Sequence, residues 1–307
     1  MTFFKKLLLI VIPSVLIVVL GLSYYVVEKI LPYSGIKPQR INAAALPEFQ
    51  KGILPSDYGL DFENFDIQTK DSITIKAYLI KTEKPRCTLI LVHGIGDCKE
   101  HFYPFCQKLK EIGCQTLILD LRAHGQSGGV YCTFGYKEKE DIATLIDSCL
   151  KKNVQGPLSI YGNSLGGAVA LQVLGENKHL KFGIIESTFD EFPKVALEYG
   201  EDFIGLRNEW ITNHVIKKSG DIAGFPPFEV KPAVSCTYIM CPIFMAHGVA
   251  DDKIPFAFGQ NNFKALKTLD KQFIAVEGAG HFDLHEKGGA AYWAKMTDFI
   301  LKNAADK

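Results

Sequence analysis

The sequence predicts an α/β fold with a mostly parallel β-sheet and helices on both of its faces. Short apolar runs alternate with stretches of helical periodicity along most of the 307 residues, as expected for strands joined by right-handed crossovers. A Gly-x-Ser-x-Gly motif follows one of these runs, and a long apolar segment lies near the amino terminus. One domain accounts for this length. The predicted strands lie at about Thr88, Thr116, Leu158, Phe182, Ile243 and Gln272.

The amino-terminal segment Leu7–Val27 is apolar and is followed by its first charge at Glu28, so its length is about one bilayer span. A cleaved signal peptide is the competing interpretation, but the segment lacks a small-residue cleavage site and a lipid-attachment cysteine. A third alternative is the core helix of a soluble domain, although such helices are seldom this long or this uniformly apolar. We predict a retained transmembrane helix, a signal anchor, over residues 1–31.

The charges beside this segment predict its orientation. Lys5 and Lys6 precede it, whereas Lys29 follows it next to the acidic Glu28. By the positive-inside rule, this arrangement favours a cytoplasmic amino terminus. The prediction is a single-pass membrane protein whose folded domain is extracytoplasmic.

The eight cysteines favour the other side of the membrane, the cytoplasmic side, for the folded domain. Cys149 and Cys241 fall inside predicted elements, where cysteine behaves as a small buried apolar residue rather than as part of a disulfide framework. A bridge between Cys98 and Cys106 remains open from the sequence.

Residues 32–60 are rich in Pro, Ala and polar residues and are predicted to be a linker between anchor and domain. The domain, residues 61–307, is expected to open with a β-hairpin. Asp61–Gln68 and Ser72–Lys81 alternate apolar and polar residues around a turn at Lys70 and Asp71, which is typical of an antiparallel pair.

The pentapeptide Gly-Asn-Ser-Leu-Gly at residues 162–166 lies between the apolar run Leu158–Tyr161 and the helix-forming stretch Gly167–Leu174. A strand, a Gly-x-Ser-x-Gly turn and a helix form a nucleophile elbow, which exposes the serine hydroxyl above the sheet. The flanking glycines are needed because a side chain there would collide with neighbouring backbone. Ser164 is therefore the predicted nucleophile.

A serine hydroxyl needs an imidazole base and a carboxylate that orients the imidazole. Two neighbouring acids, Asp251 and Asp252, follow the predicted strand Ile243–Ala246. His281 lies after the last predicted strand and before a final helix at about Ala290–Asn303. The chain order serine, acid, histidine is the one used on sheets of this kind.

The same chemistry requires two backbone amides that stabilise the oxyanion. The amide of Leu165, next to the serine, is one candidate. Ile95 is the other, because it lies in the loop after the predicted strand Thr88–Val92. His93 in this loop is interpreted as a packing and hydrogen-bonding residue, not as an acid or base.

Taken together, these motifs resemble those of the α/β-hydrolase superfamily of serine hydrolases over about Thr88–Leu301. The resemblance rests on the HGIG loop, the segment 120–128, the YGNSLGG elbow, HGVADDKIP and GAGHFD. It implies an α/β-hydrolase fold, and it selects Asp251 as the acid because the family's acid lies four residues before a proline, here Pro255. Ala123 departs from the family, which usually has glycine there; this puts the loop's backbone shape in question. Arg122 and His124 are expected to be structural.

Within the superfamily, the chain resembles membrane-anchored hydrolase-domain proteins near the monoacylglycerol-lipase, serine-aminopeptidase and prolyl-oligopeptidase-like branches. Residues 189–238 are longer than a strand connection and carry apolar residues at helical spacing, which predicts a small helical cap over the elbow. These apolar residues either pack the cap or line an acyl pocket. Glu186 is an alternative to Asp251 as the acid.

We expect a membrane-anchored serine esterase or lipase-like hydrolase that cleaves carboxylic ester or thioester bonds of small acyl or lipid-like substrates. A serine peptidase is the nearest alternative, because Glu198, Glu201 and Asp202 in the cap are potential anchors for a peptide amino terminus. An inactive, membrane-tethered binding protein is a third.

The composition excludes other classes of function. The formal net charge is zero and basic residues are not clustered, so a nucleic-acid partner is not expected. The sequence has no phosphate-binding glycine loop and no metal-ligand spacing of His or Cys. The predicted chemistry requires no cofactor and no metal.

Overall fold

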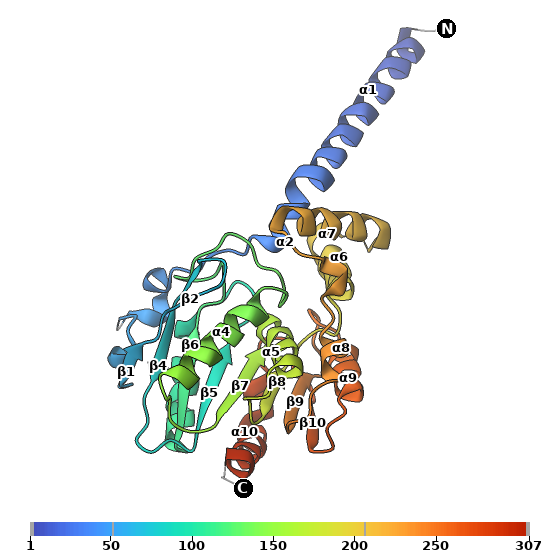
Figure 1. Cartoon of the computed structure of the whole chain (residues 1–307). Helices are drawn as coiled ribbons and strands as arrows, with labels where there is room; N and C mark the ends of the chain where they lie inside the picture. The colour runs from blue at the N-terminus through green and yellow to red at the C-terminus, as the bar shows by residue number, and fades with distance from the viewer. Residues whose placement is uncertain (1–2, 51, 206, 305–307) are drawn as a thin grey trace.

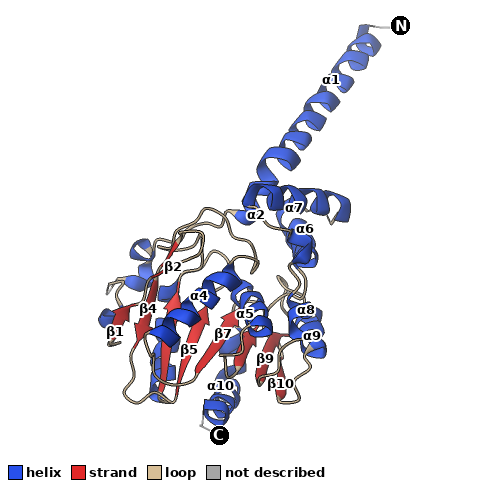
Figure 2. Cartoon of the chain, in the orientation of Figure 1, coloured by secondary structure: helices blue, strands red, loops and turns tan. Residues whose placement is uncertain are grey.

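An eight-stranded sheet forms the centre of the domain in the computed structural model, which describes residues 3–50, 52–205 and 207–304 (Figures 1 and 2). The strand order is β1-β4-β6-β5-β7-β8-β9-β10, and pairing is parallel from β6 to β10. The predicted α/β fold with a mostly parallel sheet is confirmed. The strands are β1 Phe62–Asn64, β4 Ala77–Ile80, β5 Cys87–Val92, β6 Cys114–Leu119, β7 Leu158–Asn163, β8 Gly183–Glu186, β9 Ile243–Gly248 and β10 Lys271–Val276.

The predicted opening hairpin forms, with an interruption in each arm. β1 and β4 pair antiparallel, and the short strands β2 (Ile67–Gln68) and β3 (Thr74–Ile75) make a separate two-stranded sheet at the hairpin's end.

Helices cover both faces of the sheet because every central strand is apolar on both sides. In β5, Leu89 and Leu91 belong to the apolar cluster on one face, whereas Ile90 and Val92 belong to the cluster on the other. The first face is covered by α3 (Tyr103–Glu111) and α10 (Leu284–Ala304). The second is covered by α4 (Glu138–Lys151), α5 (Leu165–Glu176), α8 (Pro232–Cys236) and α9 (Phe256–Ala265).

Two further helices, α6 (Phe192–Ile204) and α7 (Glu209–Ala223), lie between the sheet and the foot of the amino-terminal helix (Figure 1). They form most of the segment predicted as a cap. The carboxyl-terminal part of the predicted cap segment does not belong to the cap, because α8 packs against α5 on the body of the domain.

The amino-terminal helix α1 (Phe3–Tyr25) projects away from the domain (Figure 1). It continues through a π-helical turn, Val26–Ile30, into α2 (Leu31–Ile36). Within the described residues, one helical stretch, Ser14–Ile36, is long and apolar enough to cross a membrane. The first two residues of the predicted anchor and the last three of the predicted domain lie outside the described residues.

The segment predicted as a linker, residues 32–60, differs from an extended spacer. Apart from residue 51, which is not described, it follows the domain surface through several 3₁₀ turns, and Ile36, Phe49 and Leu60 are buried in the two apolar clusters. The Arg40 guanidinium donates hydrogen bonds to four carbonyls in the loop 124–129. Isolated apolar residues in a polar segment are thus enough to attach it to the core.

All eight cysteines are free thiols. Cys98 and Cys106 are both buried and do not form the bridge that the sequence left open.

Ala123, the departure from the family pattern, keeps the left-handed backbone that glycine would adopt, with φ 64°. Its N–H donates to the Gly128 carbonyl at 2.8 Å, which holds the loop. Arg122 and His124 are buried beside it, and Arg122 forms a bidentate ion pair with Asp141. Both residues thus have the structural contacts expected of them.

We predict that Ala123→Gly raises the free energy of unfolding by about 1 kcal/mol, because a left-handed conformation costs an L-residue roughly that much. The measurement is urea denaturation of the full chain in detergent. Ala294→Gly, on the exposed face of α10, is the control and should lower the stability by about the same amount. Equal signs for the two substitutions would contradict the interpretation.

Candidate active site

Ser164 lies on the sharp turn between β7 and α5 in a strained conformation, with φ 52° and ψ −121°. Its N–H donates to the Glu186 carbonyl at 2.9 Å, and its own carbonyl accepts from Thr188 Oγ1 at 2.7 Å. These hydrogen bonds hold the turn against the neighbouring strand end and present the hydroxyl to the cavity above the sheet.

The glycines on either side of Ser164 are required by close backbone contacts. A Cβ on Gly162 would lie 2.2 Å from the Gly166 carbonyl oxygen, and a Cβ on Gly166 would lie 2.0 Å from that of Val92. No side chain fits at these separations, so the motif reflects packing of α5 against β5 and β7.

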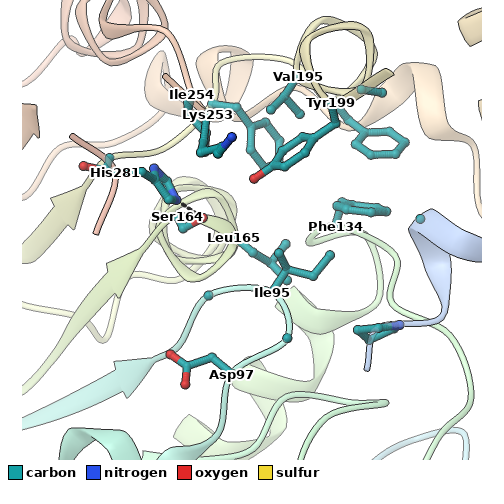
Figure 3. A pocket seen from close by; sticks show the side chains of 18 of the residues that line it. Ile95, Asp97, Phe134, Ser164, Leu165, Val195, Tyr199, Lys253, Ile254 and His281 are labelled. Atoms are coloured by element: carbon teal, nitrogen blue, oxygen red, sulfur yellow. Dashed lines mark hydrogen bonds between the residues drawn. The ribbon is translucent and has the colours of Figure 1, made fainter. Parts of the chain in front are cut away.

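The structure places the predicted base His281 against Ser164 and the predicted acid Asp251 against His281. His281 Nε2 lies 3.0 Å from Ser164 Oγ, and His281 Nδ1 lies 2.8 Å from Asp251 Oδ2. Figure 3 shows the imidazole directed at the serine hydroxyl. The nucleophile, base and orienting acid of a serine hydrolase require this chain of contacts.

Asp251 is held as a carboxylate. Its Oδ1 accepts the N–H groups of Lys253 at 3.0 Å and Ile254 at 2.8 Å, and its Oδ2 lies 3.3 Å from His247 Nε2. Burial by itself would raise its pKa, but the hydrogen bonds from His247 and His281 outweigh that effect and lower the pKa. Asp252 is exposed and faces Lys253 instead.

Both predicted oxyanion residues line the cavity beside Ser164 (Figure 3). Leu165 is the first residue of α5, where a backbone amide has no partner within its helix. Ile95 follows Gly94, whose backbone lies so close that a Cβ there would be 3.4 Å from Ser164 Cβ.

His93 connects two loops beneath this position. Its Nε2 accepts the Leu121 N–H at 3.0 Å, so Nδ1 carries the hydrogen and donates to the Gly94 carbonyl at 2.7 Å. Both ring nitrogens are used, which agrees with the structural role predicted for this histidine.

The cavity has a volume of about 810 Å³, within the range of small-molecule sites. Histidines and carboxylates line the part near the oxyanion loop and the serine, whereas most of the lining from the cap is apolar, although it includes Tyr199, Thr212 and Ser219. The apolar lining comprises Phe134, Phe189, Phe192, Val195, Ala196, Tyr199, Ile211, Val215 and Ile216.

A second histidine–carboxylate pair lines the cavity, and the sequence analysis predicted only half of it. Glu186, the alternative acid, is buried and accepts hydrogen bonds from Tyr161 at 2.7 Å, Tyr292 at 2.5 Å and His285 at 3.0 Å. It does not contact His281. The signal for His285 was its position four residues after His281, in the short stretch before the predicted final helix.

Asp97, Cys98 and His101 place one potential metal-ligand atom each within 4.8 Å of one another. Asp97 is hydrogen-bonded to His101 and raises the pKa of that histidine to about 11. Burial raises the pKa of the Cys98 thiol, which disfavours the thiolate that metals bind. This ion pair explains the cluster without a metal.

The acidic residues of the cap are paired as well. Glu198 and Glu201 bind Arg207, and Asp202 binds Lys253 at 2.8 Å. Among the described residues that line the cavity, the carboxylates are Asp97 and Glu186, and each is paired with a histidine.

We predict that Glu186→Gln lowers the free energy of unfolding by about 2 kcal/mol near pH 6, because two tyrosines and His285 lose their charged acceptor. The positive charge of His285, together with the hydrogen bonds from His285, Tyr292 and Tyr161, lowers the Glu186 pKa below its ordinary 4.5 despite burial. The contribution of Glu186 to stability therefore disappears as the pH falls through the folded-state value. The charge of Glu186 raises the His285 pKa above 6.5, so that contribution disappears as the pH rises through the raised value.

The difference in stability between wild type and variant should therefore be largest at about pH 4.5–6.5, as measured by urea denaturation from pH 4 to 9. Glu176→Gln, which removes an exposed pair with Lys139, is the control and should show little change. A pH-independent difference would contradict the assignment of charge to this pair.

The chain is similar in sequence to several known proteins. A family model described as serine aminopeptidase, S33, matches residues 83–189, which include β5, the oxyanion loop and the elbow. The protein bem46 of Schizosaccharomyces pombe is 26% identical over 305 residues, which cover 94% of this chain and 91% of that protein. The uncharacterized membrane protein YNL320W of Saccharomyces cerevisiae is 26% identical over 250 residues, 81% of this chain and 82% of that protein.

Among solved structures, the esterase Pf2001 of Pyrococcus furiosus superposes with a TM-score of 0.72. The match covers 89% of this chain and all of that one, at 23% sequence identity. This similarity shows that the two chains share a fold.

Proposed function

Because the chain belongs to the α/β-hydrolase superfamily, we propose that it is a membrane-anchored serine hydrolase that cleaves carboxylic ester or thioester bonds of acyl, lipid-like substrates. The observation that carries the proposal is the unbroken contact from Ser164 through His281 to Asp251 at the edge of a largely apolar cavity. Such a contact activates a hydroxyl, and such a cavity favours acyl chains over polar substrates.

In this mechanism, Ser164 Oγ attacks the acyl carbonyl carbon while His281 Nε2 takes the hydroxyl proton. Asp251 accepts the Nδ1–H and stabilises the imidazolium. The Ile95 and Leu165 amides bind the oxyanion, His281 passes the proton to the departing alcohol or thiol, and the acyl-enzyme forms. Water, deprotonated by His281, then releases the carboxylic acid and restores Ser164.

The helix Ser14–Ile36 supports membrane anchoring, because its large apolar side chains from Val15 to Leu22 are exposed. The charges around it favour an extracytoplasmic domain.

Peptide hydrolysis is the second candidate, favoured by the description of the family model. A peptidase of the aminopeptidase type needs an anionic group free to bind a substrate amino terminus. The pairing of the cap and cavity carboxylates with basic residues weighs against it.

We predict that a fluorophosphonate probe labels the full chain in detergent and that Ser164→Ala abolishes the labelling and lowers kcat on acyl esters by at least about 10⁴-fold. Ser148→Ala, in α4 on the opposite part of the domain, is the control and should label as the wild type does. A folded wild-type protein that takes no probe would overturn the enzyme assignment and favour a binding protein.

The choice between neighbouring acids gives a second test. Asp251→Asn should lower kcat by about 10⁴-fold, because the imidazole loses the partner that fixes its tautomer. Asp252→Asn should leave kcat within about twofold, since its side chain is 76% exposed and faces Lys253. The assignment fails if the two variants have the same ester hydrolysis rate.

A further inference from the structure

The segment that joins the anchor to the domain forms one wall of the candidate active-site cavity. Leu31, Ser34, Gly35 and Ile36 of α2 line it, followed by Pro38, Gln39 and Ile41. In Figure 3 the light-blue ribbon of this segment lies beyond Phe134 as seen from Ser164. The facing wall comes from α7, through Ile211, Thr212, Val215, Ile216 and Ser219.

Several contacts fix α2 to the cap and to the domain. Ser219 Oγ donates to the Pro32 carbonyl at 2.8 Å, and the Cys132 N–H donates to the Ile36 carbonyl at 2.7 Å. One turn earlier in the same continuous helix, Glu28 pairs with Lys218 and with His214 at 2.6 Å. The end of the anchor and the wall of the cavity are therefore one rigid unit.

The surface around this junction has the composition of a membrane interface. Trp210 is 76% exposed and lies one and two turns before His214 and Lys218, on the face of α7 that meets Glu28. Tyr24 and Tyr25, on the anchor just above, are 67% and 56% exposed. Exposed Trp and Tyr beside basic residues are typical of the headgroup level of a bilayer.

We propose that the cavity opens toward the bilayer past Ser34, Gly35 and Gln39, which line it and are exposed, and takes the long acyl chain of an ester lipid directly from the membrane. The proposal rests on the proposed function, to which it adds the substrate class and its route. The chain lies along the apolar lining under α6 and α7, and the ester reaches Ser164 at the polar end.

A bulky side chain on α2 tests the route. Gly35 lines the cavity, and a Cβ there meets no atom within 4 Å, so the first atom of the Gly35→Trp side chain fits and the variant adds an indole at the mouth. Tyr33→Trp is the matched control, because Tyr33 is 42% exposed on the same helix and is not a lining residue.

The proteins are reconstituted in phosphatidylcholine vesicles and tested with p-nitrophenyl butyrate, which is dissolved in water, and p-nitrophenyl palmitate, which is dissolved in the bilayer. Gly35→Trp should lower kcat/KM for the palmitate at least about tenfold and leave the butyrate within about twofold. Tyr33→Trp should change neither. Loss of both activities together in Gly35→Trp, or of neither, would overturn the proposed route.

Chain binding is measured separately from catalysis with a photoreactive palmitic acid analogue in the same vesicles and the Ser164→Ala protein. Cross-links in residues 31–41 and 211–219 that Gly35→Trp removes are expected. Cross-links confined to α1 would overturn the proposed route even if the enzyme is active. A wild type that hydrolyses neither ester and takes no fluorophosphonate, but gives the expected cross-links, would contradict the proposed function alone.

Discussion

The close approach of α5 to the ends of β5 and β7 is the constraint on which the site depends. It leaves no room for a Cβ at Gly162 or Gly166 and forces Ser164 into a positive φ that costs roughly 1–3 kcal/mol. The hydrogen bond from the Ser164 N–H to the end of β8 holds the turn in this strained conformation. A helix packed less closely would relax the turn and withdraw the hydroxyl from the cavity.

Parallel pairing of the strands then determines which loops supply the other residues of the site. Since β7, β8, β9 and β10 end at the same edge of the sheet, the loops after them bring Ser164, Glu186, Asp251 and the His281 loop together although the chain separates them widely. Hydrogen bonds from His247 and His281, assisted by the Ile254 N–H, lower the Asp251 pKa and keep the carboxylate ionised although burial opposes its charge. The fold thus supplies both the geometry and the electrostatics of the contact.

The strands and the elbow could be predicted because each follows from a local pattern: an apolar run or a glycine pair. The loop after β9 offered both Asp251 and Asp252, and only the resemblance to a known family selected Asp251. Two features could not be predicted. Residues 32–60 look like a linker because their few apolar side chains, such as Ile36 and Phe49, have no periodicity, and only the folded domain provides the surface that buries them. Glu186 and His285 are far apart in sequence, and their pairing depends on how α10 returns across the sheet.

Because α2 forms part of the cavity wall, the anchor helix contributes to the structure of the site itself. A flexible tether would only raise the local concentration of substrate, and any tether of the right length would do so. Here the helix that enters the proposed membrane continues into the cavity wall, and Glu28, Pro32 and Ile36 are bonded to the cap and the domain. Displacing the anchor would therefore remove lining from the cavity itself. In the proposed function, the anchor helix and the shape of the cavity are consequently one structural property of this chain.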